Sequence, residues 1–172
     1  MADWNSCLVL GGARSGKSTY AEDQALQSGR ALIYIATSQA FDTEMEDRIA
    51  LHRERRGVDW QLSEEPLELI AAIKAHDEPK NLILVDCLTL WLSNLMHAER
   101  DVVQEVQSLA ETVPGLSSKT LFVSNEVGLG IVPENALARL FRDHQGRLNQ
   151  SIAAAVDRVD LIAAGLPLTL KS

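Results

Sequence analysis

The sequence has little of what marks secreted, membrane-spanning or fibrous proteins. Its only two cysteines, Cys7 and Cys87, each lie in an apolar stretch, which fits neither a disulfide framework nor a zinc site and predicts a reduced, cytoplasmic protein. Ten glycines and five prolines are too few for a fibrous or disordered chain. No apolar run approaches the ~18 residues of a membrane span. No basic segment precedes the first apolar run, so neither membrane insertion nor a secretory signal is expected.

Positive charge is also scarce. The net charge of −8 argues against a nucleic-acid or anionic-membrane partner, although a local basic cluster could still bind an anionic small molecule. Hydrophobic residues make up 46% and charged residues 23%, as in ordinary globular proteins. The length of 172 residues predicts one domain, spanning residues 1–172.

Short apolar runs alternate with helical patterns along the chain. We predict strands at 7–10, 31–36, 81–85, 119–124 and 158–163, with an edge strand at 167–170. We predict helices at 18–27, 43–56, 66–76, 101–113 and 133–156, the last with Pro133 in the first turn, and a flexible segment at 57–65. This alternation indicates βαβ units, and therefore an α/β fold with a mostly parallel central sheet flanked by helices.

The strongest local signal is a phosphate-loop motif between the first predicted strand and helix. It consists of Gly11, Gly12, Ala13, Arg14, Ser15, Gly16, Lys17 and Ser18. Glycines let the backbone turn its N–H groups toward a phosphate, and the helix N-terminus adds a positive dipole. Lys17 can reach the β- and γ-phosphates, and the Ser18 hydroxyl can ligate Mg²⁺. The alternative is a glycine-rich turn with a surface lysine.

Asp86 ends the apolar run 82–85 and has the form of the acidic partner of a phosphate loop. In a parallel sheet it would lie beside that loop and hold Mg²⁺ directly or through water. Many buried strands also end in an aspartate at a turn. The sequence has no Asn-Lys-x-Asp motif for reading guanine, which leaves small-molecule kinases and related transferases as the leading classes.

The predicted helix 43–56 carries Arg48, His52 and Arg56 at a spacing that places them on one face. A neutral imidazole among guanidinium groups is suited to attack a phosphate, while the arginines hold the polyphosphate. The plainer interpretation is a solvated charged helix, because glutamates lie nearby. His76, His97 and His144 are expected at the surface or at helix ends.

Further motifs identify a resemblance that covers the chain from Leu8 to Lys171. They comprise the phosphate loop, 35–39, Arg48-Ile49, His52-Arg53, Trp60, 125–128, 130–133, Arg139, 141–143 and 149–150. Together they resemble the bifunctional adenosylcobinamide kinase/adenosylcobinamide-phosphate guanylyltransferase family of cobalamin synthesis, whose fold is that of P-loop NTPases.

The resemblance implies two reactions and their site residues. A nucleoside triphosphate, ATP or GTP, phosphorylates adenosylcobinamide; GTP then loads GMP onto a histidine, which passes it to adenosylcobinamide phosphate. His52 matches the guanylylated histidine. Nucleotide contacts are implied for Thr37, Ser38, Arg53, Glu54, Arg55, Arg56, Glu64 and Asp86. The family also implies a homotrimer, and Mg²⁺ held at Ser18 and Asp86. A monofunctional P-loop kinase and a nucleotide-gated regulatory module remain the alternatives.

Overall fold

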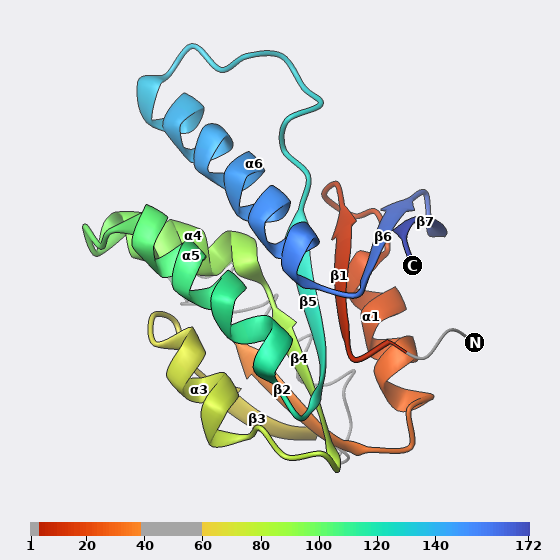
Figure 1. Ribbon diagram of the computed structural model, residues 1–172. Helices are drawn as coiled ribbons and strands as arrows, with labels where there is room; N and C mark the ends of the chain where they lie inside the picture. Colours follow the sequence, from red (N-terminus) through yellow and green to blue (C-terminus); the bar gives the residue numbers. More distant parts are fainter. Residues whose placement is uncertain (1–3, 39–59) are drawn as a thin grey trace.

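Seven strands form the centre of the structure, a computed structural model that describes residues 4–38 and 60–172 (Figure 1). The strands are β1 (Ser6–Gly11), β2 (Ala31–Ala36), β3 (Trp60–Glu64), β4 (Asn81–Asp86), β5 (Lys119–Asn125), β6 (Arg158–Ala163) and β7 (Leu166–Lys171). The helices are α1 (Lys17–Leu26), α3 (Leu69–Ala75), α4 (Leu88–His97), α5 (Val102–Thr112) and α6 (Ala136–Ala155), with a 3₁₀ turn, η2 (Val113–Gly115), after α5.

The sheet has the strand order β3-β2-β4-β5-β1-β6-β7. Every neighbouring pair is parallel except β6 and β7, which are antiparallel. The α/β prediction with a mostly parallel central sheet is therefore confirmed, and β7 occupies the predicted edge position.

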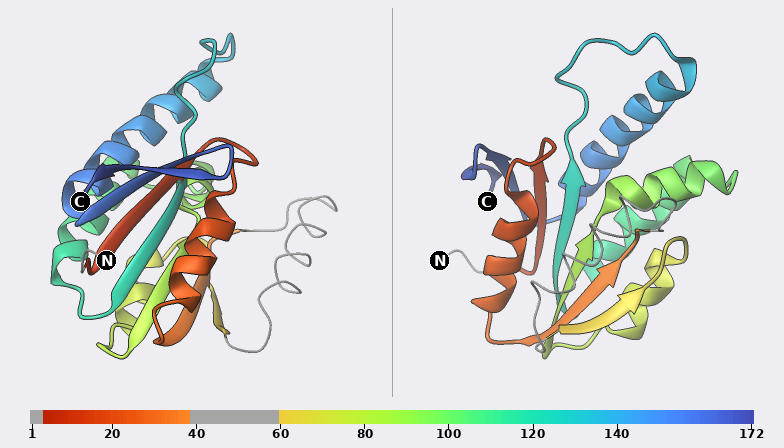
Figure 2. Two further views of the ribbon diagram at one scale, coloured as in Figure 1. Left: turned by 90° about the vertical axis from the view of Figure 1, so that its right-hand side faces the viewer. Right: turned by 180° about the vertical axis from the view of Figure 1, so that it is seen from behind.

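Alternating side chains of the central strands divide between two hydrophobic cores. In β1, Cys7 and Val9 belong to the core on the α1 side, whereas Leu8 and Leu10 belong to the larger core on the other side. Among the described helices, α1 packs on one face of the sheet, and α3, α4, α5 and α6 pack on the opposite face (Figure 2). Burial on both faces explains why these strands are continuous apolar runs.

Two elements differ from the sequence-based expectation. Residues 60–64, expected as part of a flexible segment, form the edge strand β3, which pairs only with β2. Helix α4 was not predicted, because it is buried nearly all round: Leu88, Trp91, Leu92 and Leu95 are all inaccessible to solvent. A helix that is hydrophobic on every side lacks the periodic apolar stripe by which helices are recognised.

Helix α6 begins three residues later than predicted. Its N-cap is Asn135, whose side-chain oxygen accepts a hydrogen bond from the Ala138 backbone N–H at 3.1 Å. Pro133 therefore lies before the helix instead of in its first turn. The Arg139 guanidinium donates to the Pro133 carbonyl at 3.0 Å and fixes the approach to the cap. The predicted helix 43–56 lies outside the described residues.

Candidate nucleotide-binding site

The carboxyl ends of the parallel strands bring separate parts of the sequence to one edge of the sheet. Gly11 of β1 is in register with Asn125 of β5, and Asp86 of β4 is in register with Val123 of β5 and with Ala36 of β2. Ligands of open α/β sheets bind outside this edge. One detail differs from the expectation: β5 stands between β1 and β4, so Asp86 is two strands away from the phosphate loop.

The phosphate loop joins β1 to α1 in a conformation that requires its glycines. A Cβ on Gly11 would lie 2.4 Å from the Ser15 hydroxyl oxygen and 2.8 Å from the Ile162 carbonyl oxygen, closer than any side chain allows. Gly16 has a φ of 95°, in the left-handed region that favours glycine. Arg14 is also left-handed, with a φ of 56°. The loop is therefore a specific folded structure instead of a generic turn.

The loop presents donors that suit a phosphate. Gly16 caps α1 without any side-chain hydrogen bond, and no acidic residue lies in the first turn. The N–H groups of that turn consequently lack a side-chain acceptor, as in helix N-termini that bind anions. The Lys17 ammonium folds back over the loop and donates to the Gly12 carbonyl at 3.3 Å. The Ser15 hydroxyl oxygen is buried and has no hydrogen-bond partner among the described residues.

Cys87 directly follows Asp86 at the end of β4, and its buried thiol is affected by the charges of Asp86 and Lys17. Burial and the Asp86 carboxylate raise the pKa of the Cys87 thiol to about 12, against the opposing effect of the Lys17 ammonium. The Tyr34 hydroxyl donates to Asp86 Oδ2 at 2.7 Å and orients the carboxylate. The Tyr34 ring meets Trp60 edge-to-face at 5.7 Å, which fixes the tyrosine in turn.

The residues at this edge fit a magnesium ion. Ser18 offers a hydroxyl oxygen and Asp86 a carboxylate, the hard oxygen donors that Mg²⁺ prefers, and Mg²⁺ commonly uses one or two protein ligands with substrate phosphates and water. Asn125 adds a buried side-chain oxygen that has no hydrogen-bond partner within residues 4–38 and 60–172. This unsatisfied acceptor lies in register with Gly11, at the start of the phosphate loop.

The nucleotide contacts implied at Thr37, Ser38 and Glu64 differ in their placement. Thr37 is fully buried, and its hydroxyl donates to the Cys87 carbonyl at 2.7 Å and accepts from the Cys87 N–H at 3.0 Å. This hydroxyl therefore joins the segments that follow β2 and β4 and holds the two strand ends together. Ser38 follows it and is half-buried. Glu64 is exposed at the end of β3, in register with Ala36, on the far side of β2 from Asp86.

Several predicted site residues lie outside the part of the chain that the structure describes. These are His52, Arg53, Glu54, Arg55 and Arg56. Their roles stay predictions.

The remaining histidines are in the described part of the chain. His76 caps the end of α3 and His97 ends α4, as expected of helix-end residues, whereas His144 lies half-buried within α6.

The sequence motif at 125–128 contains two residues whose place in the site the spacing did not reveal. Asn125 ends β5, and its backbone N–H donates to the Thr89 hydroxyl at 2.8 Å. The Glu126 N–H donates to the Gly11 carbonyl at 3.1 Å, so the chain leaving β5 is tied to the phosphate loop. The sequence identified this pair only through its resemblance, because nothing local indicates that β5 adjoins β1.

A buried network of neutral polar side chains supports Asn125. Asn149 of α6 donates to the Asn125 carbonyl at 3.0 Å and accepts from the Ser124 hydroxyl at 2.7 Å. The Gln145 amide donates to Ser124 Oγ at 2.9 Å and to Asn149 Oδ1 at 3.0 Å. Helix α6 thus positions the end of β5 through hydrogen bonds as well as apolar packing.

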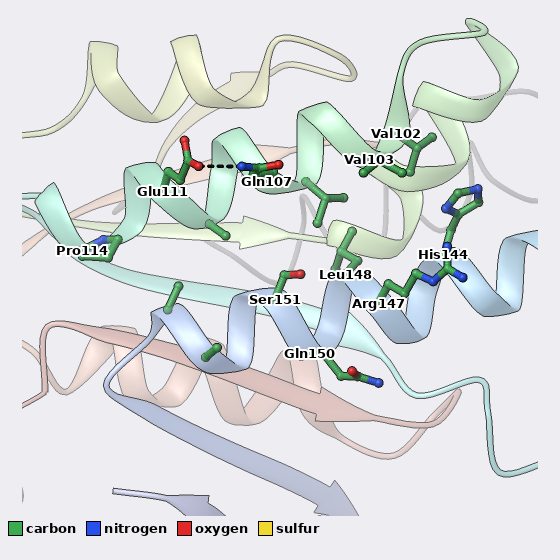
Figure 3. A pocket seen from close by; sticks show the side chains of 14 residues that line it. Val102, Val103, Gln107, Glu111, Pro114, His144, Arg147, Leu148, Gln150 and Ser151 are labelled. Carbon is green, nitrogen blue, oxygen red and sulfur yellow. Dashed lines mark hydrogen bonds between the residues drawn. The ribbon is translucent and has the colours of Figure 1, made fainter.

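A separate groove of about 670 Å³ lies between α5 and α6 (Figure 3). His144 and Arg147 line it from α6, and Gln107 and Glu111 line it from α5, where the Gln107 amide donates to the Glu111 carboxylate at 2.9 Å. The two helices cover the face of the sheet opposite α1 (Figure 1). The groove is therefore distinct from the nucleotide site at the strand ends.

The fold and the loop together define a P-loop nucleotide-binding protein. A solved structure of a prototypical ATPase from the type III secretion system of pathogenic bacteria shares the fold, with a TM-score of 0.55 at 12% identity; the match covers 96% of this chain and 56% of that chain. No helix among the described residues is long and apolar enough to cross a membrane.

Sequence comparison assigns the family. Residues 7–170 match the family described as cobinamide kinase / cobinamide phosphate guanyltransferase, and the chain belongs to it. The chain is 48% identical to the bifunctional adenosylcobalamin biosynthesis protein CobP of Pseudomonas aeruginosa, over 95% of this chain and 96% of that protein. It is 41% identical to the bifunctional adenosylcobalamin biosynthesis protein CobU of Salmonella typhimurium, over 95% and 98%.

Proposed function

We propose that this chain phosphorylates adenosylcobinamide with ATP or GTP and then converts adenosylcobinamide phosphate into adenosylcobinamide-GDP. The observation that carries the proposal is the phosphate loop at the strand ends, with Asp86 at the same edge of the sheet, in a chain that matches the bifunctional family over residues 7–170. The site supplies what both reactions need first, which is a binding place for the phosphates of a nucleoside triphosphate.

In the kinase reaction the substrate hydroxyl oxygen bonds to the γ-phosphorus and the bond from that phosphorus to the bridging oxygen breaks. ADP or GDP leaves, and the hydroxyl proton passes to solvent. The loop N–H groups and the Lys17 ammonium hold the β- and γ-phosphates and stabilise the developing negative charge. Ser18 and Asp86 would hold Mg²⁺, which when bound neutralises phosphate charge.

In the guanylyl transfer a neutral His52 nitrogen attacks the α-phosphorus of GTP. An N–P bond forms, the α-phosphorus–oxygen bond breaks, and pyrophosphate leaves. A phosphate oxygen of adenosylcobinamide phosphate then attacks the same phosphorus and regenerates the histidine. Arg53, Arg55 and Arg56 hold the nucleotide charge near His52, and Glu54 contacts the same nucleotide. An unperturbed histidine has a pKa near ~6.5 and is largely neutral at pH 7.

The finer assignments belong to the same proposal. We place the protein in the cytoplasm as a homotrimer, with Mg²⁺ as its metal and adenosylcobinamide and its phosphate as small-molecule partners. The two cysteines support a reducing compartment, because Cys7 and Cys87 are both free thiols in the interior of the protein.

The test is product analysis with adenosylcobinamide, GTP and Mg²⁺, joined to incubation with GTP labelled at the α-phosphate. We expect adenosylcobinamide phosphate, then adenosylcobinamide-GDP, and covalent label on the protein. Phosphorylated product without label or GDP conjugate would identify a monofunctional kinase. Nucleotide binding without either product would identify a regulatory module.

A further inference from the structure

The turn between β6 and β7 lies directly against the phosphate loop. The Gly165 backbone N–H donates to the Ser15 carbonyl at 2.8 Å. The Gly165 Cα lies 3.2 Å from the position that a Cβ on Gly16 would occupy. Residues about 150 positions apart in the chain thus meet at the site, and the turn can be followed beside the loop in Figure 2.

The phosphate loop needs such support because its backbone is strained. Arg14 has a φ of 56°, in the left-handed region that non-glycine residues rarely adopt. Strained residues persist only where the surrounding structure fixes them. Two contacts hold this loop from outside: Glu126 N–H to the Gly11 carbonyl at its start, and Gly165 N–H to the Ser15 carbonyl near its end.

The turn is itself built to hold one position. Ala164 and Gly165 have φ values of 52° and 78°, the two consecutive left-handed residues of a type I′ hairpin turn. Such a turn matches the natural twist of its two strands. The Gly165 N–H therefore points in a direction that the hairpin geometry determines.

A buried carboxylate ties the hairpin to the helix that follows the phosphate loop. Asp160 of β6 is 1% exposed and accepts from Arg158 Nε at 2.8 Å and from the Thr169 hydroxyl of β7 at 2.7 Å. It also accepts from the Tyr20 hydroxyl of α1 at 3.0 Å.

We propose that the β6–β7 turn is a positioning element of the nucleotide site, with Gly165 as its contact and Asp160 as its anchor. By fixing the Ser15 carbonyl, the turn keeps the loop N–H groups facing the phosphates before a nucleotide binds. Preorganisation of this kind strengthens binding by removing an ordering cost. The inference rests on nucleotide binding by the phosphate loop, as in the proposed function.

The experiment replaces Gly165 by Asn, Ala or Val. Among the described residues no atom lies within 4 Å of a Cβ at this position, so the Cβ itself meets no neighbour and the three variants are ranked by their backbone preference. Asn tolerates the left-handed region, Ala less well, and the β-branched Val least. Gly29→Val is the matched control, because Gly29 has a φ of 67°, also has open space around it, and lies beyond the opposite end of α1.

The measurements are the Kd for GTP with Mg²⁺ by calorimetry, the kcat and KM of the kinase reaction, and the thermal midpoint. We expect Gly165→Asn to bind within about twofold of wild type, Gly165→Ala about threefold more weakly, and Gly165→Val about tenfold more weakly, which corresponds to ~1.4 kcal/mol. KM for the nucleotide should rise while kcat at saturation stays near wild type. Gly29→Val should lower the thermal midpoint and leave the Kd unchanged.

An unchanged Kd in Gly165→Val, equal weakening in the Asn and Val variants, or equal weakening in Gly29→Val would each overturn the proposal. If Gly165→Val does not fold, the Ala and Asn variants decide by the same criterion. A wild-type chain that binds no GTP would instead contradict the proposed function.

Discussion

The phosphate loop and the β4–β5 edge, by which we mean Asp86, Ser124, Asn125 and Glu126, lie at the same edge of the sheet but are built in different ways. The loop works mainly through backbone N–H groups, and eight contiguous residues encode it. The β4–β5 edge presents side chains at the ends of two strands, which Tyr34 and helix α6 position, and it is tied to the loop by the Glu126 backbone N–H. A backbone site is sensitive to chain conformation, whereas a side-chain site is sensitive to single functional groups.

The largest expected effect is the loss of guanylyl transfer on substitution of His52. This residue belongs to neither region, and it would supply the nucleophile that both regions lack. His52→Ala removes the proposed nucleophile, and neighbouring Leu51 cannot replace it. No GMP–protein adduct should form, and guanylyl transfer should fall by orders of magnitude. Phosphorylation of adenosylcobinamide should largely survive, so its phosphate should accumulate. Intact-protein mass spectrometry after GTP treatment, at neutral or alkaline pH because phosphoramidates are acid-labile, gives the measurement.

His97→Ala is the matched control for His52→Ala, since His97 is exposed at the end of α4. It should form the adduct normally. A GMP-sized mass increase on His52→Ala would assign the nucleophile to another residue. Loss of both activities in a well-folded His52→Ala protein would show that phosphorylation also depends on His52.

Lys17→Ala tests the ammonium group that we assign to the β- and γ-phosphates. Its ammonium has no substitute in transfer of the γ-phosphoryl group, so kinase activity should fall by ~10²-fold or more. The measurement is the kinase kcat/KM, with circular dichroism to verify folding. Lys80→Ala is the control, because this lysine is exposed and pairs only with nearby Glu78 among the ion pairs of the described residues. Near wild-type phosphorylation by Lys17→Ala would remove the lysine from the mechanism.

Ser18→Ala and Asp86→Ala test whether the two regions share a metal. Each variant loses one oxygen donor, so each should need more Mg²⁺ for half-maximal kinase activity. A magnesium titration of the kinase rate measures this change. Asp23→Ala, an exposed acid on α1, should keep the wild-type titration curve. Wild-type magnesium dependence in both Ser18→Ala and Asp86→Ala would contradict the metal assignment.

The smallest effect concerns stability and examines how α6 supports the β4–β5 edge. Asn149→Ala removes partners of Ser124, Gln145 and the Asn125 carbonyl, all within the buried network. An unsatisfied buried polar group costs about 1–3 kcal/mol, so the free energy of unfolding should fall by about 2 kcal/mol. Urea unfolding of Asn149→Ala and of Gln150→Ala, its exposed neighbour, gives the comparison. Equal losses would mean that the network contributes nothing beyond helix propensity.

The contrast between the two regions also explains where sequence-based prediction succeeded. The phosphate loop was predicted as a unit, and the strand before it and the helix after it are confirmed, because local residues determine all three. The family and the α/β fold are likewise confirmed. The segment 60–64 and helix α4 were missed, since a short edge strand and a helix buried on all sides lack a periodic signal.

By itself, then, the sequence determined the phosphate loop, because glycine spacing and a following helix are properties of neighbouring residues. It also determined that Asp86 ends a buried strand. Only the tertiary structure decided that β5 stands between β1 and β4, which brings Asn125 and Glu126 to the loop. Only the tertiary structure brought Gly165 against Ser15. Contacts between strands that are distant in the sequence depend on the spatial order of the strands in the whole sheet, and no local pattern encodes that order.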